Sequence, residues 1–282
     1  MTDTPSTRPF RFGVIADPQY ADVPPSREHD RFYANSLDKI AEALDVFRRQ
    51  AVDLVVVLGD LIDHDFRHFE AVIGALADLP MPLVMLPGNH DFDIATDERC
   101  RVRDMLGMPA AYYQQSFDGI RFIVLDTTEI ALFSSNPGDP RHDEAMAMLD
   151  ALKAKGAPNA RDWNAGMSAA QIAWLEEMLH QAEAAGERAI LLGHYPLHPL
   201  TDHGLWNADA VSQVIARSPA AIAYFCGHDH RGNYGRKGGT HFLNMKGMVD
   251  TERTNAFAVV TVEEHRIEIE GFGREASRTL RY

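Results

Sequence analysis

The stretch from Val55 to Asp63 constrains the fold more than any other part of the chain. It reads Val-Val-Val-Leu-Gly-Asp-Leu-Ile-Asp, an apolar run rich in β-branched residues that ends in a glycine and an aspartate. Such a run predicts a strand buried on both faces, as parallel strands are. Asp60 therefore lies just beyond the carboxyl end of this strand, which is where open α/β sheets bind their ligands.

Four more predicted strands end in the same way. Each is followed by one or two Asp, Gln, Asn or His side chains, which can act in binding or catalysis. These residues are Asp17 and Gln19 after strand 10–16, Asn89 after strand 83–86, His194 after strand 188–193, and His228 and His230 after strand 220–226. Because the carboxyl ends of parallel strands meet at one edge of a sheet, we expect these side chains to gather around Asp60.

Segments with apolar residues at helical spacing lie between most of these strands. The first part of the chain is therefore a βαβαβ pattern. A later group of short β-runs is expected to be antiparallel. The predicted helices cover residues 30–47, 64–79, 144–155, 169–185 and 208–217, the hairpin covers 112–126, and the late β-runs cover 232–236, 241–245, 256–262 and 267–272. We predict an α/β (α+β) chain with a flexible segment 1–9, a single domain over 10–282, and a surface insertion at 129–165.

The charge balance narrows the classes of partner. The formal net charge is −14, so we expect neither nucleic acid nor an anionic membrane as the main partner. Two cysteines, Cys100 and Cys226, provide no disulfide framework. No window has the roughly 20 apolar residues of a membrane span, and the polar start lacks a signal-peptide core. We expect a cytoplasmic protein and leave its oligomeric state open.

The donors after the strands suit a metal centre better than a thiol site. Carboxylate and amide oxygens with imidazoles, and without thiolates, fit Mn²⁺, Fe, Zn²⁺ or Mg²⁺. A central carboxylate such as Asp60 can bridge two ions. Two cations about 3.5–4 Å apart can hold the attacking and leaving oxygens of a phosphoryl displacement. A lone aspartate such as Asp17 is more often a turn residue or helix cap, but seven such donors in order favour ligands.

These motifs resemble those of the calcineurin-like metallophosphoesterases. Asp-x-Gln, Gly-Asp-x-x-Asp, Gly-Asn-His-Asp, Gly-His and Gly-His-Asp-His follow one another between residues 11 and about 250. The resemblance implies a four-layer α/β/β/α sandwich with two mixed sheets flanked by helices. It implies one metal on Asp17, Gln19, Asp60 and His230, a second on Asp60, Asn89, His194 and His228, and a catalytic pair of His90 and Asp63. Asp91 matches a position that orients the ligands.

Gln19 departs from the family, whose first motif is usually Asp-x-His. An amide oxygen is a harder donor than imidazole, which favours Mn²⁺ or Mg²⁺. Segments 13–22, 31–37, 164–166 and 205–207 are similar to the manganese-dependent ADP-ribose/CDP-alcohol diphosphatases. That similarity implies that a hydroxide bridging two ions, expected to be Mn²⁺, attacks the pyrophosphate bond of small nucleotides such as ADP-ribose or CDP-choline. It implies substrate contacts by Arg31, Tyr33, His198, Met167 and Trp206.

Simpler explanations and other functions stay open at this point. Trp206 and Met167 are more often core residues, and Arg31 and Tyr33 could be a solvated and a packed residue of the first helix. A cyclic-nucleotide or other phosphodiesterase of the same fold is the alternative enzyme, although such enzymes usually carry Asp-x-His. A binding scaffold without catalysis is a third reading, yet a scaffold would be expected to have lost metal ligands.

Overall fold

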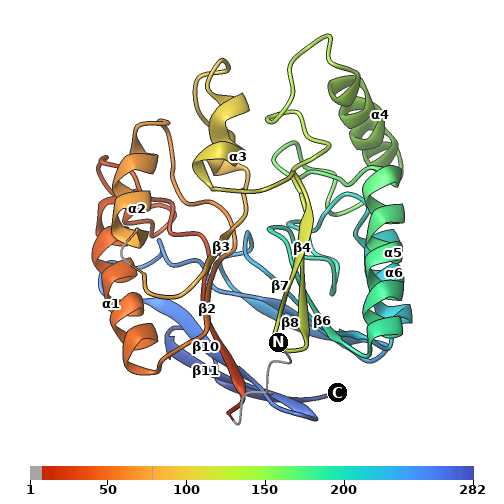
Figure 1. The fold of residues 1–282 in the computed structure, drawn as a ribbon. Helices are drawn as coiled ribbons and strands as arrows, with labels where there is room; N and C mark the ends of the chain where they lie inside the picture. Colours follow the sequence, from red (N-terminus) through yellow and green to blue (C-terminus); the bar gives the residue numbers. More distant parts are fainter. Residues whose placement is uncertain (1–7, 78) are drawn as a thin grey trace.

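Two six-stranded mixed sheets form the centre of the molecule (Figure 1). The computed structural model describes residues 8–77 and 79–282. The first sheet has the order β12-β11-β10-β1-β2-β3, with β12 Arg278–Arg281, β11 Arg266–Gly273, β10 Ala256–Val262, β1 Phe10–Ile15, β2 Leu54–Val57 and β3 Leu83–Met85. The second has the order β4-β5-β6-β7-β9-β8, with β4 Tyr113–Phe117, β5 Ile120–Val124, β6 Arg188–Leu192, β7 Ala221–Cys226, β9 Thr240–Asn244 and β8 Asn233–Lys237.

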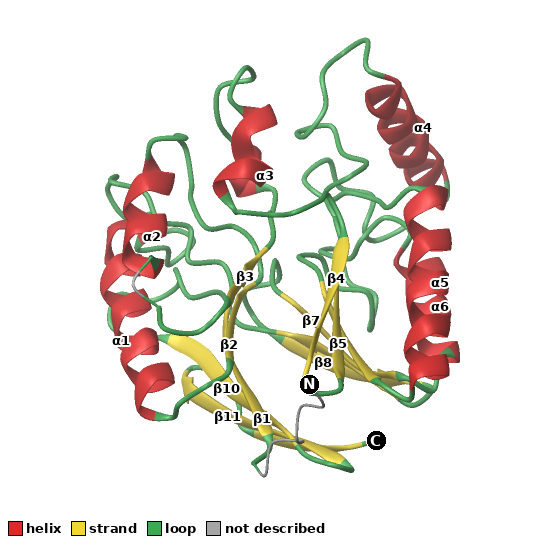
Figure 2. Cartoon of the chain, viewed as in Figure 1, coloured by secondary structure: helices red, strands yellow, loops and turns green. Residues whose placement is uncertain are grey.

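Helices cover the outer face of each sheet, as the red and yellow layers of Figure 2 show. The helices are α1 Ser36–Arg49, α2 His68–Leu76, α3 Val102–Met105, α4 Pro140–Ala154, α5 Ala169–Ala185 and α6 Ala208–Arg217. Helices α1 and α2 pack on the first sheet, and α5 and α6 pack on the second. The predicted four-layer α/β/β/α sandwich is therefore confirmed.

The apolar run of β2 is suited to the interior because both of its faces are buried. Leu54 and Val56 point into the core between the two sheets, whereas Val55 and Val57 pack against the α1 and α2 layer. Successive side chains of a strand point to opposite faces, so only an unbroken apolar run can satisfy both layers. Burying each valine contributes about 1.5–3 kcal/mol relative to leaving it exposed.

Parallel pairing brings the strand ends together. Strands β1, β2 and β3 are mutually parallel, and so are β5, β6, β7 and β9. The antiparallel expectation for the late strands fails for β9, which pairs in parallel with β7. The reason is that β8 lies at the sheet edge and its hairpin returns β9 between β8 and β7, in the direction of β7. The edge strand β12 was not predicted.

The segment 129–165 emerges beside the same edge of the sheets. Two backbone hydrogen bonds between Ile130 and Gly166, of 3.0 and 2.8 Å, close its base. Its helix α4 packs through Ala145 and Leu149 onto Trp206. The predicted flexible segment 1–9 lies outside the described residues except for its last two positions.

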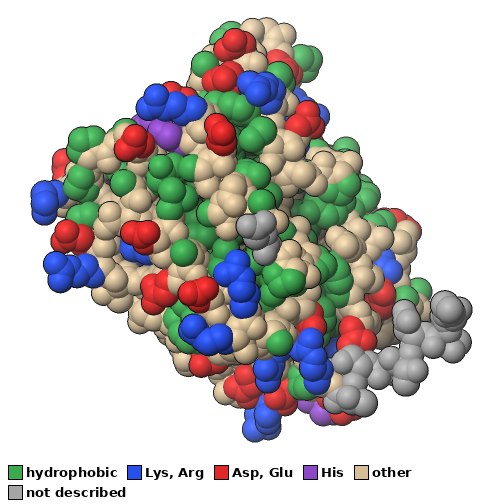
Figure 3. All heavy atoms as spheres, turned by 60° about the vertical axis from the view of Figure 1, so that its left-hand side comes forward, with side chains coloured by type: hydrophobic (Ala, Val, Ile, Leu, Met, Phe, Trp, Pro, Cys, Tyr) green, Lys and Arg blue, Asp and Glu red, His purple; other side chains and the backbone are tan. Residues whose placement is uncertain are grey.

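The surface over α1 and α2 carries both signs of charge. Acidic and basic side chains are interspersed on this face, with no broad area of one sign in view (Figure 3). Among the helices of the described residues, none is long and apolar enough to cross a membrane.

Candidate metal centre

Side chains from both sheets meet at the carboxyl ends of β1, β2, β3, β6 and β7. Asp60, His194 and His228 are buried, and each offers a ligand atom within 4.8 Å of the others. Asp17 and Gln19 are also fully buried beside them. The structure therefore brings together residues that lie more than 200 positions apart in the chain.

Backbone strain is concentrated at this edge. Asp17, Gln19, Asp60 and His228 have φ angles of 50°, 43°, 52° and 70° respectively, in the left-handed region that favours glycine. Each such residue costs about 1–3 kcal/mol and persists only where the surroundings hold it. Clustering of strain at four of the seven predicted ligands is typical of a functional site.

Two glycines allow the loops to approach closely. A Cβ on Gly88 would lie 2.1 Å from Oδ1 of Asp60, and a Cβ on Gly59 would lie 2.6 Å from Nδ1 of His194. Both distances are far below van der Waals contact. The glycines of the Gly-Asp and Gly-Asn-His-Asp motifs are thus required by packing.

His194 presents one nitrogen to a group of acceptors. Its Nδ1 lies 2.8 Å from the carbonyl of Leu58, to which it donates, so Nε2 is the nitrogen left for a ligand. Nε2 faces Oδ1 of Asn89 at 3.2 Å and Oδ2 of Asp60 at 3.4 Å. Burial lowers the pKa of His194, but Asp60 raises it to about 9 overall. Asp60 thus favours a positive charge at this point, which a metal cation that displaces the proton of Nε2 would supply.

His230 and Gln19 form the other half of the centre. Nδ1 of His230 donates to Oδ1 of Asp250 at 2.7 Å, which leaves Nε2 free to face Nε2 of Gln19 at 3.2 Å. Gln19 Nε2 also donates to Oδ2 of Asp60 at 3.1 Å, while its buried Oε1 has no hydrogen-bond partner. A half-turn of the amide would bring this oxygen between Asp60 and His230. An orphaned buried oxygen there fits the predicted metal ligand.

His228 joins the two halves. Its backbone N–H donates to both carboxylate oxygens of Asp17, at 3.0 and 3.1 Å. Its Nε2 lies 3.0 Å from Oδ1 of Asn164. Burial and the neighbouring His194 hold the pKa of His228 well below its usual range, so the imidazole is neutral, as a metal ligand must be.

His90 lies beside this ligand group and close to Asp63. Nδ1 of His90 lies 3.1 Å from Oδ1 of Asp63, and the side chain is 22% exposed. Its backbone N–H donates to Oδ1 of Asp60 at 2.8 Å. Burial lowers the pKa of His90, but the charges of Asp60 and Asp63 outweigh that effect and raise it. A cationic imidazole is thus favoured beside the metal group.

Asp91 connects the loops that carry Asp60 and Asn89. Its Oδ1 accepts hydrogen bonds from the backbone N–H groups of Leu61 and Ile62, and its Oδ2 accepts one from Gly88. All three donors belong to the loops after β2 and β3. The carboxylate therefore fixes these two loops relative to each other.

A second group of possible ligands lies next to the first. Asp63, His64 and Asp93 place ligand atoms within 4.8 Å of one another, and His64 and Asp93 are exposed. Asp63 already faces His90, so we assign this group to the surroundings of His90 and not to a separate ion.

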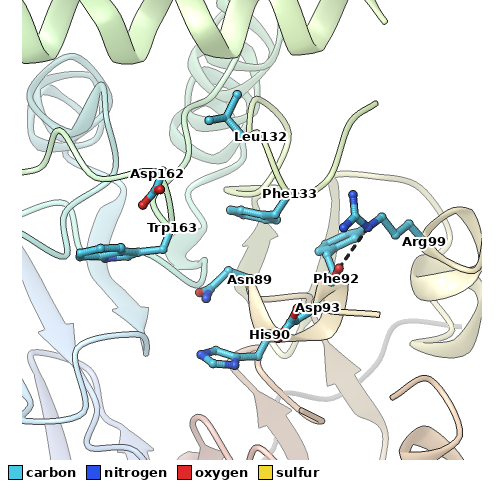
Figure 4. Close-up of a pocket in the computed structure, with 9 residues that line it drawn as sticks. All are labelled: Asn89, His90, Phe92, Asp93, Arg99, Leu132, Phe133, Asp162 and Trp163. Carbon is cyan, nitrogen blue, oxygen red and sulfur yellow. Dashed lines mark hydrogen bonds between the residues drawn. The ribbon is translucent and has the colours of Figure 1, made fainter. Parts of the chain in front are cut away.

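A cavity of about 380 Å³ opens beside His90 and Asn89 (Figure 4). The segment 129–165 provides its upper wall, and the loop after β3 provides the lower wall. Trp163 is 43% exposed, which is unusual for so large an apolar side chain. The cavity is lined by Asn89, His90, Phe92, Asp93, Arg99, Leu132, Phe133, Asp162 and Trp163. Its aromatic wall and its contact with His90 fit a substrate pocket.

Two predicted substrate residues lie on the Asp63 side of the centre. Arg31 precedes α1 and pairs through its backbone with Asp250, so it is not on the helix as one reading had it. The ring of Tyr33 packs edge-on against His64, with the centroids 5.5 Å apart. Burial and the charge of Asp63 raise the pKa of Tyr33 against the opposing effect of Arg31. Both residues thus lie close to the candidate catalytic pair.

The other three predicted substrate residues do not line the cavity beside His90. Met167 and Trp206 are 1% and 3% exposed, and the indole nitrogen of Trp206 donates to the carbonyl of Arg161. Neither offers a surface to a ligand in this conformation. His198 packs edge-on against Phe242 of β9, with the centroids 5.7 Å apart.

Sequence reasoning missed three residues that the structure brings to the site. Asp250 carries no motif, because it lies 20 residues after His230 in an irregular loop. Asn164 belongs to a segment that resembled the diphosphatases, but nothing local assigned it a partner. Trp163 precedes it, and only its exposure in the cavity distinguishes it from a core tryptophan.

Comparisons with known proteins agree with this geometry. Residues 10–232 match the family model of the calcineurin-like phosphoesterases. The chain is 26% identical to a mouse protein named manganese-dependent ADP-ribose/CDP-alcohol diphosphatase, over 97% of this chain and 93% of that protein. A rice protein of the same name is 26% identical, over 96% and 94% of the two chains.

A solved structure extends the likeness to three dimensions. The crystal structure of a dimetal phosphatase from Danio rerio aligns with a TM-score of 0.87 at 26% identity, over 98% of this chain and 99% of that one. That protein is named a dimetal phosphatase, in keeping with the donors that converge here. The chain belongs to the calcineurin-like phosphoesterase family of metal-dependent hydrolases.

Proposed function

We propose that this protein hydrolyses the pyrophosphate bond of nucleoside-diphosphate-linked compounds, such as ADP-ribose and CDP-choline. The observation that carries this proposal is the cavity beside His90, because it adjoins the metal-ligand group and has an aromatic wall. Its volume of about 380 Å³ falls within the range of about 300–1,000 Å³ typical of small-molecule sites. The names of the mouse and rice relatives support the same substrate class.

We assign the nucleobase and the phosphates of the substrate to different side chains around the metal group. Trp163 and Phe133 offer apolar ring surface to a nucleobase, which stacks on aromatic side chains. Arg31 lies close enough to His90 to lower its pKa, and its guanidinium can pair with a phosphate there. The phosphates would then lie across the metal group.

Two divalent cations complete the proposed centre. Asp17, Gln19, Asp60 and His230 would hold one, and Asp60, Asn89, His194 and His228 would hold the other. Bound there, they would neutralise the charge of the diphosphate and lower the pKa of a water molecule. Three oxygen donors in the first set favour Mn²⁺ or Mg²⁺ over softer metals, and the relatives' names favour Mn²⁺.

His90 would contribute positive charge to the reacting phosphate. Asp60 and Asp63 raise its pKa against the effect of burial, and Oδ1 of Asp63 lies 3.1 Å from its Nδ1. The leaving group of a pyrophosphate is itself a phosphate, which needs little protonation. We therefore assign His90 mainly to charge stabilisation of the transition state.

A turnover assay with product analysis tests the proposal. The purified protein with Mn²⁺ is incubated with ADP-ribose, CDP-choline or 3′,5′-cyclic AMP, and products are separated by ion-exchange chromatography. We expect AMP with ribose 5-phosphate from the first substrate, CMP with phosphocholine from the second, and little from the third. Preferential turnover of the cyclic nucleotide would replace this proposal with a phosphodiesterase.

The metal content of the same sample provides the control. Two bound Mn²⁺ ions per chain, measured by mass spectrometry of the metal, establish that the centre is loaded. A loaded protein that is inactive on both diphosphates contradicts the proposed substrate class.

A further inference from the structure

The side-chain amide of Asn164 has a single possible orientation. Its Nδ2 lies 3.1 Å from the carbonyl oxygen of Asn159 and 2.8 Å from that of Asp202. Carbonyl oxygens only accept hydrogen bonds, so the amide nitrogen must be on this side. Asn164 is fully buried, and rotating the amide would set its oxygen against two other oxygens. Its Oδ1 is therefore fixed on the opposite side.

This orientation determines the tautomer of His228. Oδ1 of Asn164 lies 3.0 Å from Nε2 of His228 and can only accept a hydrogen bond. Nε2 of His228 must therefore carry the proton. In a neutral imidazole the lone pair is then on Nδ1, the nitrogen left to bind a metal. His194 and His230 are set the other way, because each donates from Nδ1 to an oxygen outside the ligand group and turns Nε2 toward predicted ligands, Asn89 and Asp60 for His194 and Gln19 for His230.

We propose that Asn164 is a positioning residue that holds His228 in its Nε2-protonated tautomer and presents Nδ1 to the metal. The inference rests on His228 as a metal ligand, and it does not depend on which phosphate compound is the substrate. A hydrogen bond to the far nitrogen of a ligating histidine fixes its tautomer and ring orientation, and its loss costs about 10–100-fold in metal affinity.

The same contact links the metal group to the cavity. Asn164 follows Trp163 directly, so the chain that forms the cavity wall also holds a metal ligand. The backbone N–H of Asn164 donates to the carbonyl of Arg161, which also accepts from Trp206. Segment 129–165 is thereby connected to His228 through one buried side chain.

The test uses Mn²⁺ alone, without any substrate. In Asn164→Ala, titration calorimetry should show one of two Mn²⁺ sites weakened about 10–100-fold, while the other keeps its affinity. Nitrogen-15 NMR of the metal-free protein gives a second measurement. We expect a protonated Nε2 for His228 in the wild type, and exchange between both tautomers in Asn164→Ala.

Asn159→Ala is the matched control. Asn159 is a buried asparagine of the same segment, and its Nδ2 donates to the carbonyls of Leu205 and Trp206 without touching a histidine. It should keep both Mn²⁺ affinities and the His228 tautomer. Asn164→Asp retains an acceptor oxygen facing Nε2, so it should bind Mn²⁺ within a few-fold of the wild type even if less stable.

Two results would overturn the inference. One is an Asn164→Ala protein with wild-type Mn²⁺ affinities and an unchanged His228 spectrum. The other is an equal loss in Asn159→Ala, which would mean that anchoring the loop alone matters. Inactivity of the wild type on diphosphates would contradict only the proposed function, because the Mn²⁺ titration and the nitrogen-15 spectra are read without substrate.

Discussion

Asp250 holds His230 through a hydrogen bond of 2.7 Å between its Oδ1 and the imidazole Nδ1. The backbone of Asp250 also pairs with that of Arg31, so one residue connects a candidate metal ligand to the substrate side of the centre. A carboxylate behind a ligating histidine fixes the ring and increases its basicity.

Replacement of Asp250 by alanine should weaken Mn²⁺ binding at the site of Asp17, Gln19 and His230 about 10–100-fold. The ring of His230 would lose its partner and its preferred tautomer. Asp250→Asn keeps an acceptor oxygen and should lose only a few-fold. Titration calorimetry measures both, and equal affinity in all three proteins would show that the contact is unimportant for the metal.

Asp60→Asn should weaken both metals together. Asp60 contacts Gln19, His194 and the backbone of His90, which belong to both halves of the centre. Its pKa is held below the usual range because His194 and His90 outweigh the opposing effect of burial, so it is a full anion. Metal analysis after dialysis should give well under two ions per chain. Normal affinity at both sites would remove its bridging role.

His90→Ala should reduce turnover on the order of 10²-fold while the metal content stays at two. The bond from residue 90 to Asp60 comes from the backbone and survives the substitution. Asp63→Asn should reduce turnover less, and the double variant should be no slower than His90→Ala because the pair acts as a unit. Loss of both metals in His90→Ala would make this histidine structural.

Trp163→Ala should raise the KM for ADP-ribose about ten-fold or more with a smaller effect on kcat. Stacking of a base on an aromatic ring is worth about 1–3 kcal/mol. Trp163→Phe retains a ring and should lie close to the wild type. Steady-state kinetics with both variants checks this, and an unchanged KM in Trp163→Ala would place the base elsewhere.

Lys39 should make stability depend on pH in the alkaline range. The side chain is 5% exposed, and its Nζ donates to the carbonyls of Met248, Asp250 and Thr251 at 2.7–2.9 Å. Burial, with a smaller contribution from Arg274, lowers its pKa from 10.5 to about 8. The folded state therefore holds this proton less tightly than the unfolded chain does.

The sign of the effect follows from that difference. Between about pH 8 and 10.5 unfolding takes up a proton at Lys39, so its contribution to the free energy of unfolding rises with pH. The contribution is complete above 10.5 and is lost as the pH falls through 8. Urea denaturation across this range gives the free energy of unfolding of the wild type and of Lys39→Met. The difference between the two proteins should rise with pH. Parallel curves for the two proteins would contradict the lowered pKa.

Most helices and strands could be predicted from local sequence because their residue patterns are distinct. The unbroken apolar run of β2, the spacing of α5 and the glycine turn between β4 and β5 each match one secondary structure. The direction of β9 was missed, since a hairpin's place in a sheet depends on which strand reaches the edge. The neighbour of β9 is determined by the assembled sheet, and the five residues of this strand do not encode it.

The ligand motifs were readable for a related reason. Each donor follows a strand whose end is fixed by the fold, so Asp60 and His194 are placed by elements that the sequence predicts. Contacts between irregular loops are not positioned by an element that the sequence predicts. Met167 and Trp206 were given substrate roles from a local resemblance, and the structure buries both.

By itself, the sequence determined the initial βαβαβ pattern, the edge at which the candidate ligands meet, and the donor types that suit divalent cations, and its resemblance to a family implied the sandwich. Only the tertiary structure decided which buried groups hold those donors: Asp250 behind His230, Asn164 behind His228, and Trp163 at the cavity wall. The physical reason is the separation in sequence of the residues that interact. Strand ends follow from periodicity within a few residues, whereas each of these contacts joins loops or covers a site through side-chain packing that forms only once both sheets are assembled.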